Sequence, residues 1–280
     1  FSFSEELQQE WRWSERFAAQ PEILAYARHI AERFDLRREI RFETRVTDAA
    51  WDDTAGLWRI ATNRGESLTA RYFFMATGCL SSARLPDIPG IADFKGRHFH
   101  TGYWPHEKVD FTGRRVAVIG TGSSAIQSIP VIAEEARQLT VFQRTPNFSI
   151  PSRNRPMDDE YEQGWKRDYA NLRQEARMMR TGILYGLSEI HAMTVSAEER
   201  RAEYEKRWEA GGTAFMGAFR DLLLDQAAND TAAEFVRSKI RETVKDPVTA
   251  EKLCPRNHPI GTKRICVDTH YYETYNRPNV

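Results

Sequence analysis

Cysteine is scarce in this 280-residue chain, which has only Cys79, Cys254 and Cys266. The three residues form no C-x-x-C pair and no even-numbered set, so the sequence indicates neither a disulfide framework nor a zinc site. His106, His258 and His270 also lack the spacing of metal ligands. We therefore expect no metal centre and a reducing, cytoplasmic environment.

Net charge and long apolar runs are missing as well. The 40 basic residues balance the 40 acidic ones, which argues against a nucleic-acid-binding surface. The longest apolar runs, such as VAVI and YFFMA, are far too short to span a bilayer. The start, FSFSEELQQEW, has neither the basic nor the apolar region of a signal peptide, so we expect none. We expect no nucleic acid and no membrane among the partners. Because the chain starts with Phe1 and stops at YNRPNV, we expect an internal piece of a longer protein.

The first part of the chain predicts one helix and three strands. Apolar residues recur at helical spacing from Pro21 to Phe34. The segments IRFETRV, LWRIAT and LTARYFFMATG are rich in β-branched and aromatic residues and are separated by short turns. They predict an antiparallel meander whose last strand ends in a buried run. A linker rich in proline and serine follows, LSSARLPDIPG.

The second part predicts a β-α-β unit followed by helices. RRVAVIG has the pattern of a buried strand, SSAIQSIPVIAEEARQ that of a helix, and LTVFQRT that of the next strand. Strand signals vanish over 150–255, where helical periodicity predicts an insertion, and strand and loop character returns over 256–280. The fold class is therefore α/β. It combines a Rossmann-like domain carrying a helical insertion with an incomplete domain built on the meander.

A glycine turn joins the predicted strand and helix. VAVIGTGSSA places Gly120 and Gly122 in the turn and the small Ala125 where the helix packs on the strand. The first glycine permits a tight turn, and the second lets the backbone approach a pyrophosphate at the helix N-terminus. Because a strand precedes the turn and a helix and a strand follow it, the sequence predicts a dinucleotide site.

The second strand indicates which dinucleotide binds. In an NAD site this strand usually ends in an acid that accepts a hydrogen bond from the ribose 2′-hydroxyl. Here it ends in Gln143, Arg144 and Thr145. The arginine suits a 2′-phosphate, so the sequence favours NADP(H). The alternative is that Arg144 is a solvated surface charge.

One short stretch carries a family resemblance. FKGRHFHTGYWP contains the pattern F-x-G-x-x-x-H-x-x-x-W-P at Phe94, Gly96, His100, Trp104 and Pro105. This pattern resembles the fingerprint of Baeyer–Villiger monooxygenases. Strings along nearly the whole chain are similar to the branch that includes phenylacetone monooxygenase, among them SFSEELQQEW, HTGYWPHEKVDFTG, VFQRTPNF, EFVRSKIR, GTKR and YYETYNR.

The resemblance implies a reaction and a division into domains. Members of this family use FAD, NADPH and O2 to insert oxygen next to a ketone carbonyl, giving an ester or a lactone. The implied divisions are a partial FAD-binding domain (1–80), an NADP-binding domain with the linker fingerprint (81–149), the helical insertion (150–255) and a return to the NADP-binding domain (256–280). The family's FAD-binding glycine turn is absent from this sequence. We therefore expect only a piece of the FAD site, with exposed sheet edges and apolar surface.

Roles for individual residues follow from the resemblance alone. Arg264 resembles the family's catalytic arginine, which stabilises an oxygen-derived anion, as a permanent cation can. Lys263 resembles a ligand of the 2′-phosphate. The remaining implied cofactor contacts lie in the phosphate turn (Thr121, Ser123, Ser124), at the 2′-phosphate (Arg144, Thr145) and in the FAD part (Val46, Thr77, Gly78).

Several alternatives stay open. Flavin N- and S-monooxygenases share the first part of the fingerprint, although Trp104, Pro105 and GTKR favour the Baeyer–Villiger class. A non-catalytic NADP(H)-binding fragment is the other alternative. Within the fingerprint, His100 and Trp104 either govern domain motion or only pack and form local hydrogen bonds.

Overall fold

The chain folds into two compact units. The computed structural model describes residues 2–179, 182–184 and 186–280. One unit consists of the residues up to Ala18 together with Lys108–Val280, and the other is Ala19–Glu107. We call them the major unit and the minor unit. The two units are defined by contacts within the chain. The domain boundaries at 80, 149 and 255 instead divide the chain by the cofactor that each part is expected to bind, and they stay a prediction.

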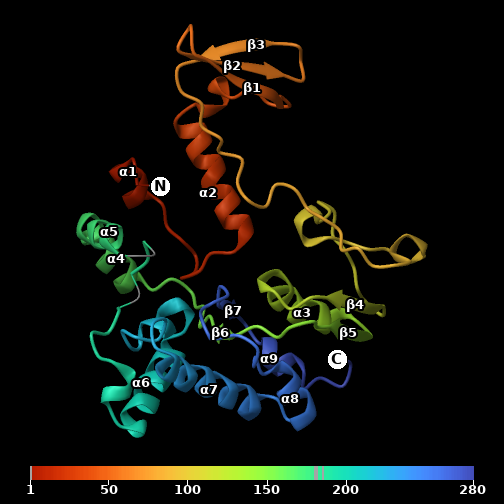
Figure 1. Ribbon diagram of the computed structural model, residues 1–280, viewed down its shortest axis with the longest axis vertical. Helices are drawn as coiled ribbons and strands as arrows, with labels where there is room; N and C mark the ends of the chain where they lie inside the picture. The colour runs from red at the N-terminus through yellow and green to blue at the C-terminus, as the bar shows by residue number, and fades with distance from the viewer. Residues whose placement is uncertain (1, 180–181, 185) are drawn as a thin grey trace. The chain divides into compact units, whose positions relative to one another are not determined.

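The minor unit contains a helix and a three-stranded sheet (Figure 1). The helix is α2 (Gln20–Arg33), which agrees with the predicted bounds to within one residue and has proline in its first turn. The strands pair antiparallel in the order β1-β2-β3, as the meander predicts. Their bounds are β1 (Val46–Asp52), β2 (Leu57–Thr62) and β3 (Ser67–Ala70).

The first and third predicted strands are misplaced. The first was predicted over 40–46 but is observed as Val46–Asp52, so the two ranges share only Val46. Glu43 adopts a left-handed conformation with φ 54°, which interrupts extended backbone before Val46. The third strand ends at Ala70, which pairs with Trp58 near the start of β2, so β2 offers almost no residues to pair beyond it. The following run is exposed rather than buried, with Phe74 84% exposed.

The exposed run agrees with the expectation of open apolar surface. Other large apolar side chains in this stretch are equally accessible: Tyr72, Met75 and Leu80. From there to residue 107 the chain has little regular structure, and its helical turns are two short 3-10 turns, Ile91–Asp93 and Thr101–Tyr103.

The major unit contains the predicted β-α-β element. β4 (Arg115–Ile119) and β5 (Gln138–Phe142) are parallel neighbours, and α3 (Ser123–Glu135) connects them. The register runs from Arg115 opposite Gln138 to Ile119 opposite Phe142, which brings the carboxyl ends of both strands to one edge. The helix continues through Pro130. This edge is where a dinucleotide is expected to bind.

The predicted insertion is helical, as the periodicity indicates. Its helices are α4 (Asp159–Arg167), α5 (Tyr169–Met178), α6 (Ala197–Ala210), α7 (Gln226–Thr243) and α8 (Pro247–Leu253). A short parallel pair frames it: β6 (Ser149–Pro151) and β7 (Cys266–Asp268). The return segment then ends in α9 (Tyr271–Thr274) rather than in loop alone.

One hydrophobic core joins these elements. Ile126 and Ile129 of α3 are fully buried and belong to the same cluster as Val236 and Ile240 of α7. Figure 1 shows α7, α8 and α9 in blue, with β7 between α8 and α9 in the chain. The insertion is therefore packed into the core that supports the β-α-β element, and it is not an appended domain.

The amino-terminal segment is fixed to the insertion by buried charge. α1 (Glu5–Glu10) precedes an extended stretch, and the Lys166 ammonium on α4 donates to the carbonyls of Gln9 (2.8 Å) and Trp11 (2.9 Å). The same ammonium lies 2.8 Å from the Glu162 carboxylate, and both side chains are buried. Pairing and hydrogen bonding make this buried charge tolerable.

Candidate functional site

The glycine turn has the geometry that the sequence predicts. Gly120 has a φ of +106°, which side chains other than glycine rarely adopt, and its amide donates to the carbonyl of Phe142 at 2.8 Å. Gly122 has an ordinary φ of −83°. A Cβ placed on either glycine would meet nothing within 4 Å among the described residues. The turn is therefore open on the side from which a phosphate would approach.

The helix that follows the turn offers free backbone donors. Gly122 is the N-cap of α3 and supplies no side-chain hydrogen bond to the first turn of the helix. Ser123 and Ser124 are exposed beside it, and Ala125 packs against the core. Unpaired N–H groups and the helix dipole favour an anion at this point. The predicted phosphate-turn residues therefore lie together around one open helix terminus.

Thr121 ties this turn to the end of β5. Its side chain is buried, and its hydroxyl donates to the carbonyl of Thr145 at 3.1 Å. The residue directly after β5 is also held, since the Gln143 side-chain amide donates to the carbonyl of Lys252 at 2.8 Å. The structure thus brings Thr121 and Thr145 into direct contact, as a shared cofactor pocket requires.

Arg144 follows β5 and is exposed. Among the residues that the structure describes, no carboxylate pairs with its guanidinium. A cation in this position is available to a 2′-phosphate, which is the role the sequence predicts.

The GTKR loop comes to the same region. Lys263 and Arg264 are exposed, and within the described part of the chain neither has an ion-pair partner. The loop leads into β7, where the Cys266 amide donates to the carbonyl of Phe148 at 3.1 Å. Because β6 and β7 are parallel, the segments that carry Arg144 and Arg264 enter this pair from the same end.

Cys266 and Asn147 connect these segments. The Asn147 amide donates to the Cys266 sulfur at 3.0 Å. Burial raises the pKa of the Cys266 thiol, and hydrogen bonds from Asn147 and Ser123 oppose that shift more weakly. Cys266 is thus a buried thiol close to the start of α3, and it packs as a small core residue.

Sequence reasoning missed three polar side chains here: Asn147, His258 and Asn229. Burial and, second, the charge of Lys263 lower the pKa of His258. The ring of His258 packs edge-on against Phe148, with centroids 5.4 Å apart. The position of His258 three residues before GTKR was the one available signal. Asn229 lies within an ordinary amphipathic helix and gave none.

The predicted FAD contacts lie in the minor unit. Val46 begins β1 and pairs with Thr62, and Gly78 has a φ of +68°. Thr77, just before Gly78, lies in the exposed segment after β3. The structure therefore places these three residues in the minor unit and the phosphate turn, Arg144 and Arg264 in the major unit.

The fingerprint also lies in the minor unit and forms local contacts. His100 Nδ1 accepts a hydrogen bond from the Gly102 amide at 3.0 Å and so caps the turn Thr101–Tyr103. The ring of Phe94 lies over Gly96, where a Cβ would come within 2.5 Å of it. Trp104 packs at a tilt against Phe99, with centroids 5.5 Å apart. These contacts are local to the stretch that Pro105 ends, and the roles of His100 and Trp104 stay predictions.

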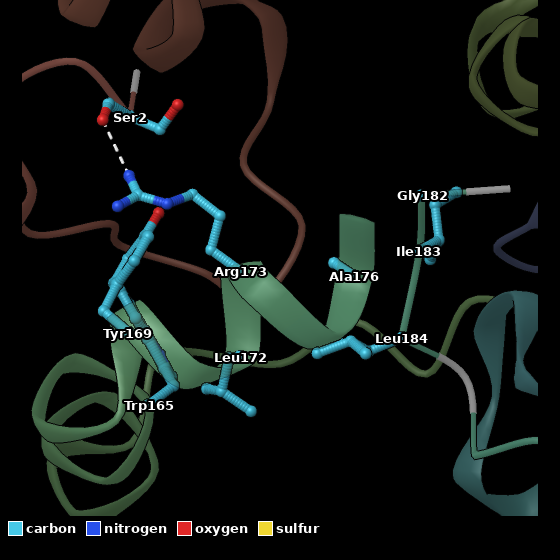
Figure 2. Close-up of a pocket in the computed structure, with 9 residues that line it drawn as sticks. All are labelled: Ser2, Trp165, Tyr169, Leu172, Arg173, Ala176, Gly182, Ile183 and Leu184. Atoms are coloured by element: carbon cyan, nitrogen blue, oxygen red, sulfur yellow. Dashed lines mark hydrogen bonds between the residues drawn. The ribbon is translucent and has the colours of Figure 1, made fainter. Parts of the chain in front are cut away.

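A shallow apolar groove lies elsewhere in the major unit. It has a volume of about 410 Å³. Figure 2 shows its lining, in which the Arg173 guanidinium donates to the carbonyl of Ser2. The lining residues are Ser2, Trp165, Tyr169, Leu172, Arg173, Ala176, Gly182, Ile183 and Leu184. The groove includes none of the residues predicted for cofactor binding or catalysis.

The described residues contain no cluster of three or more His, Cys, Asp or Glu side chains able to hold a metal ion. No helix within them is long and apolar enough to cross a membrane. The open helix terminus and the unpaired cations fit a phosphorylated dinucleotide.

Comparison with known proteins defines the family. A model described as flavin-binding monooxygenase-like matches residues 12–172, which is more than half of the chain. The chain belongs to that family. Over its whole length it also matches a Baeyer–Villiger monooxygenase of Pseudooceanicola batsensis, with 42% identity over 282 residues, 100% of this chain and 51% of the relative.

Two further relatives show the range of the family. The 2-oxo-Δ3-4,5,5-trimethylcyclopentenylacetyl-CoA monooxygenase of Pseudomonas putida is 45% identical over 278 residues, covering 97% of this chain and 51% of that protein. A phenazine N-monooxygenase of Lysobacter antibioticus is 41% identical over 282 residues, covering 100% and 52%. The chain spans about half the length of these relatives.

Solved structures of related enzymes also match nearly the whole of this chain and about half of their own length. An oxidized steroid monooxygenase bound to NADP superposes with a TM-score of 0.95 and 54% identity, covering 100% of this chain and 54% of that one. The OTEMO complex with FAD and NADP gives a TM-score of 0.94 and 43% identity, covering 99% and 53%. The chain thus has the mixed α/β fold of about half of such an enzyme.

Proposed function

We propose that the protein containing this chain is a Baeyer–Villiger monooxygenase that uses NADPH, FAD and O2 to convert a ketone into an ester or lactone. The observation that carries the proposal is the convergence of the open glycine turn, the end of β5 and the GTKR loop in one unit. Relatives include monooxygenases named for cyclohexanone and cyclopentanone, which supports a ketone as substrate.

Most of the site residues of this chain bind the cofactors in this proposal, and one acts in catalysis. The turn Gly120–Gly122 and the first turn of α3, with Ser123, Ser124 and the packing residue Ala125, hold the pyrophosphate of NADP. Arg144, Thr145 and Lys263 hold its 2′-phosphate, and this contact selects NADP over NAD. When bound, NADPH supplies a hydride and FAD supplies activated oxygen.

Arg264 is the proposed catalytic residue. Its guanidinium is permanently charged and has no carboxylate partner among the described residues, so its charge is not neutralised in advance. A fixed cation next to developing negative charge lowers the barrier because it needs no reorganisation during the reaction. Val46, Thr77 and Gly78 are the proposed FAD contacts of the minor unit.

Within the family, we propose a position near phenylacetone monooxygenase and its close relatives. The strings SFSEELQQEW and VFQRTPNF, which resemble that branch, support it. N-oxygenation is the second candidate, because a phenazine N-monooxygenase is 41% identical over the whole chain.

Product analysis separates these functions. The complete protein is supplied with FAD, NADPH, O2 and, in turn, a ketone, a sulfide and a phenazine. Ester or lactone formed from the ketone supports the Baeyer–Villiger reaction. N-oxide alone supports the second candidate. A protein that binds NADPH but retains no FAD and forms no product is a non-catalytic NADP(H)-binding protein, and both oxygenase functions are then rejected.

A further inference from the structure

A single amide side chain of the helical insertion holds both backbone groups of the residue that precedes GTKR. Asn229 lies on α7 and is 5% exposed. Its Oδ1 accepts a hydrogen bond from the Ile260 amide at 3.0 Å. Its Nδ2 donates to the Ile260 carbonyl at 2.8 Å and to the Leu222 carbonyl at 2.8 Å. All three partners are backbone groups, which fixes the orientation of the amide unambiguously.

The loop beyond Ile260 is shaped by neighbouring contacts. Gly261 has a φ of +90°, and a Cβ there would come within 2.5 Å of Leu223 and 3.1 Å of Met216. The Thr262 hydroxyl donates to the Pro259 carbonyl at 2.8 Å. After this turn the chain reaches Lys263 and Arg264, which have no ion pair of their own within the described chain. Their placement therefore depends on the backbone of the turn.

We propose that Asn229 is a positioning residue that sets the place of Lys263 and Arg264 by clamping Ile260 to the helical insertion. The proposal rests on the proposed function, because it assigns the loop its role in binding the 2′-phosphate and in catalysis. Asn229 acts through the backbone of Ile260. The insertion thereby takes part in the nucleotide site and does more than fill space around it.

Burial makes the backbone groups of Ile260 depend on the Asn229 side chain for their hydrogen bonds. Ile260 is fully buried, so removing the Asn229 side chain leaves its amide and carbonyl without that partner at a position shielded from bulk water. Backbone groups buried without a partner are strongly disfavoured, so the loop is expected to shift until they find one. A shift of that kind moves the two cations that follow.

A matched control exists in the same unit. Asn276 also uses both ends of its amide on backbone groups, accepting from the Lys245 amide at 2.8 Å and donating to the Thr243 carbonyl at 2.8 Å. These contacts hold the carboxyl end of α7 and do not involve residues 259–264. Asn276→Ala therefore removes the same chemistry at a place that does not support the loop.

The test begins with hydrogen–deuterium exchange on the ligand-free chain. Asn229→Ala is expected to speed exchange at the Ile260 amide by at least about tenfold and to leave Lys245 unchanged, whereas Asn276→Ala does the reverse. If Asn229→Ala fails to fold, Asn229→Ser provides the milder variant. Unchanged exchange at Ile260 in a folded Asn229 variant overturns the clamp.

Nucleotide binding then tests the consequence for the site. The ratio of the NAD+ and NADP+ dissociation constants is measured by calorimetry for both alanine variants. Asn229→Ala is expected to lower the preference for NADP+ about tenfold, and Asn276→Ala to retain it. An equal preference in both variants overturns the positioning role. These titrations use the complete protein. If the unaltered complete protein binds neither nucleotide, the proposed function fails, and the exchange comparison still reports on the clamp.

Discussion

The Thr121 hydroxyl donates a 3.1 Å hydrogen bond to the carbonyl of Thr145, so the glycine turn and the end of β5 are joined directly. Thr121 lies between the two glycines of the turn, and Thr145 follows Arg144. The bond therefore couples the segment proposed to hold the pyrophosphate to the segment proposed to hold the 2′-phosphate. This coupling underlies the first two predictions.

The two glycines of the turn are expected to respond differently to alanine. Gly122 has a φ of −83° and free space around it, so Gly122→Ala is expected to cost at most about 1 kcal/mol, from alanine at the N-cap of α3. It is nevertheless expected to weaken NADP+ binding, because a Cβ obstructs the pyrophosphate. Gly120 has a φ of +106°, so Gly120→Ala is expected to cost about 1–3 kcal/mol of stability. Thermal unfolding measures the loss of stability, and titration with NADP+ measures the loss of binding. Similar stability losses in the two variants would contradict the claim that only Gly120 requires the backbone freedom of glycine.

Arg144→Ala is expected to weaken NADP+ binding by about tenfold or more and NAD+ binding little, because a charge-assisted contact to the 2′-phosphate is lost. Arg137→Ala is the matched control, since Arg137 is an exposed arginine at the opposite end of β5. Calorimetric titration with each nucleotide provides the measurement. An equal loss for both nucleotides in Arg144→Ala would rule out the 2′-phosphate role.

Lys166→Met is expected to destabilise the major unit by about 1–3 kcal/mol, because the Glu162 carboxylate loses its buried partner and keeps only the exposed Arg12. The same change frees the carbonyls of Gln9 and Trp11, so protease cleavage before residue 18 should become faster. Arg201→Ala breaks an exposed pair with Glu205 and is expected to cost at most about 1 kcal/mol. Denaturant unfolding compares the variants, and equal losses would refute the importance of the buried pair.

Acid stability is expected to depend on Glu251. Hydrogen bonds from Arg241 and then Arg256 lower the pKa of this carboxylate from 4.5 to about 2. A lowered pKa in the folded state means that the contribution to stability is complete above pH 4.5 and is lost as the pH falls toward 2. Glu251→Gln should therefore flatten the stability profile between these values. A profile as steep as that of the unaltered chain would show that other carboxylates dominate it.

The sequence predicted the elements whose signals are local. The periodicity of α2, the β-α-β element and the glycine turn were all visible in single segments, and the structure confirms them. The end of β3 at Ala70 could not be predicted, because it depends on where β2 begins. The clamp formed by Asn229 was also hidden, since it joins residues 31 positions apart in the chain. Pairing partners and long-range contacts are properties of the fold, not of any one segment.

The most direct test of the proposed function follows labelled oxygen. The complete protein, loaded with FAD, is given NADPH, cyclohexanone and ¹⁸O₂, and the products are analysed by mass spectrometry. The account predicts a lactone that carries one ¹⁸O atom, formed with NADPH and not with NADH. Oxidation of NADPH that yields no labelled lactone from this or other ketones would contradict the assignment to Baeyer–Villiger oxidation.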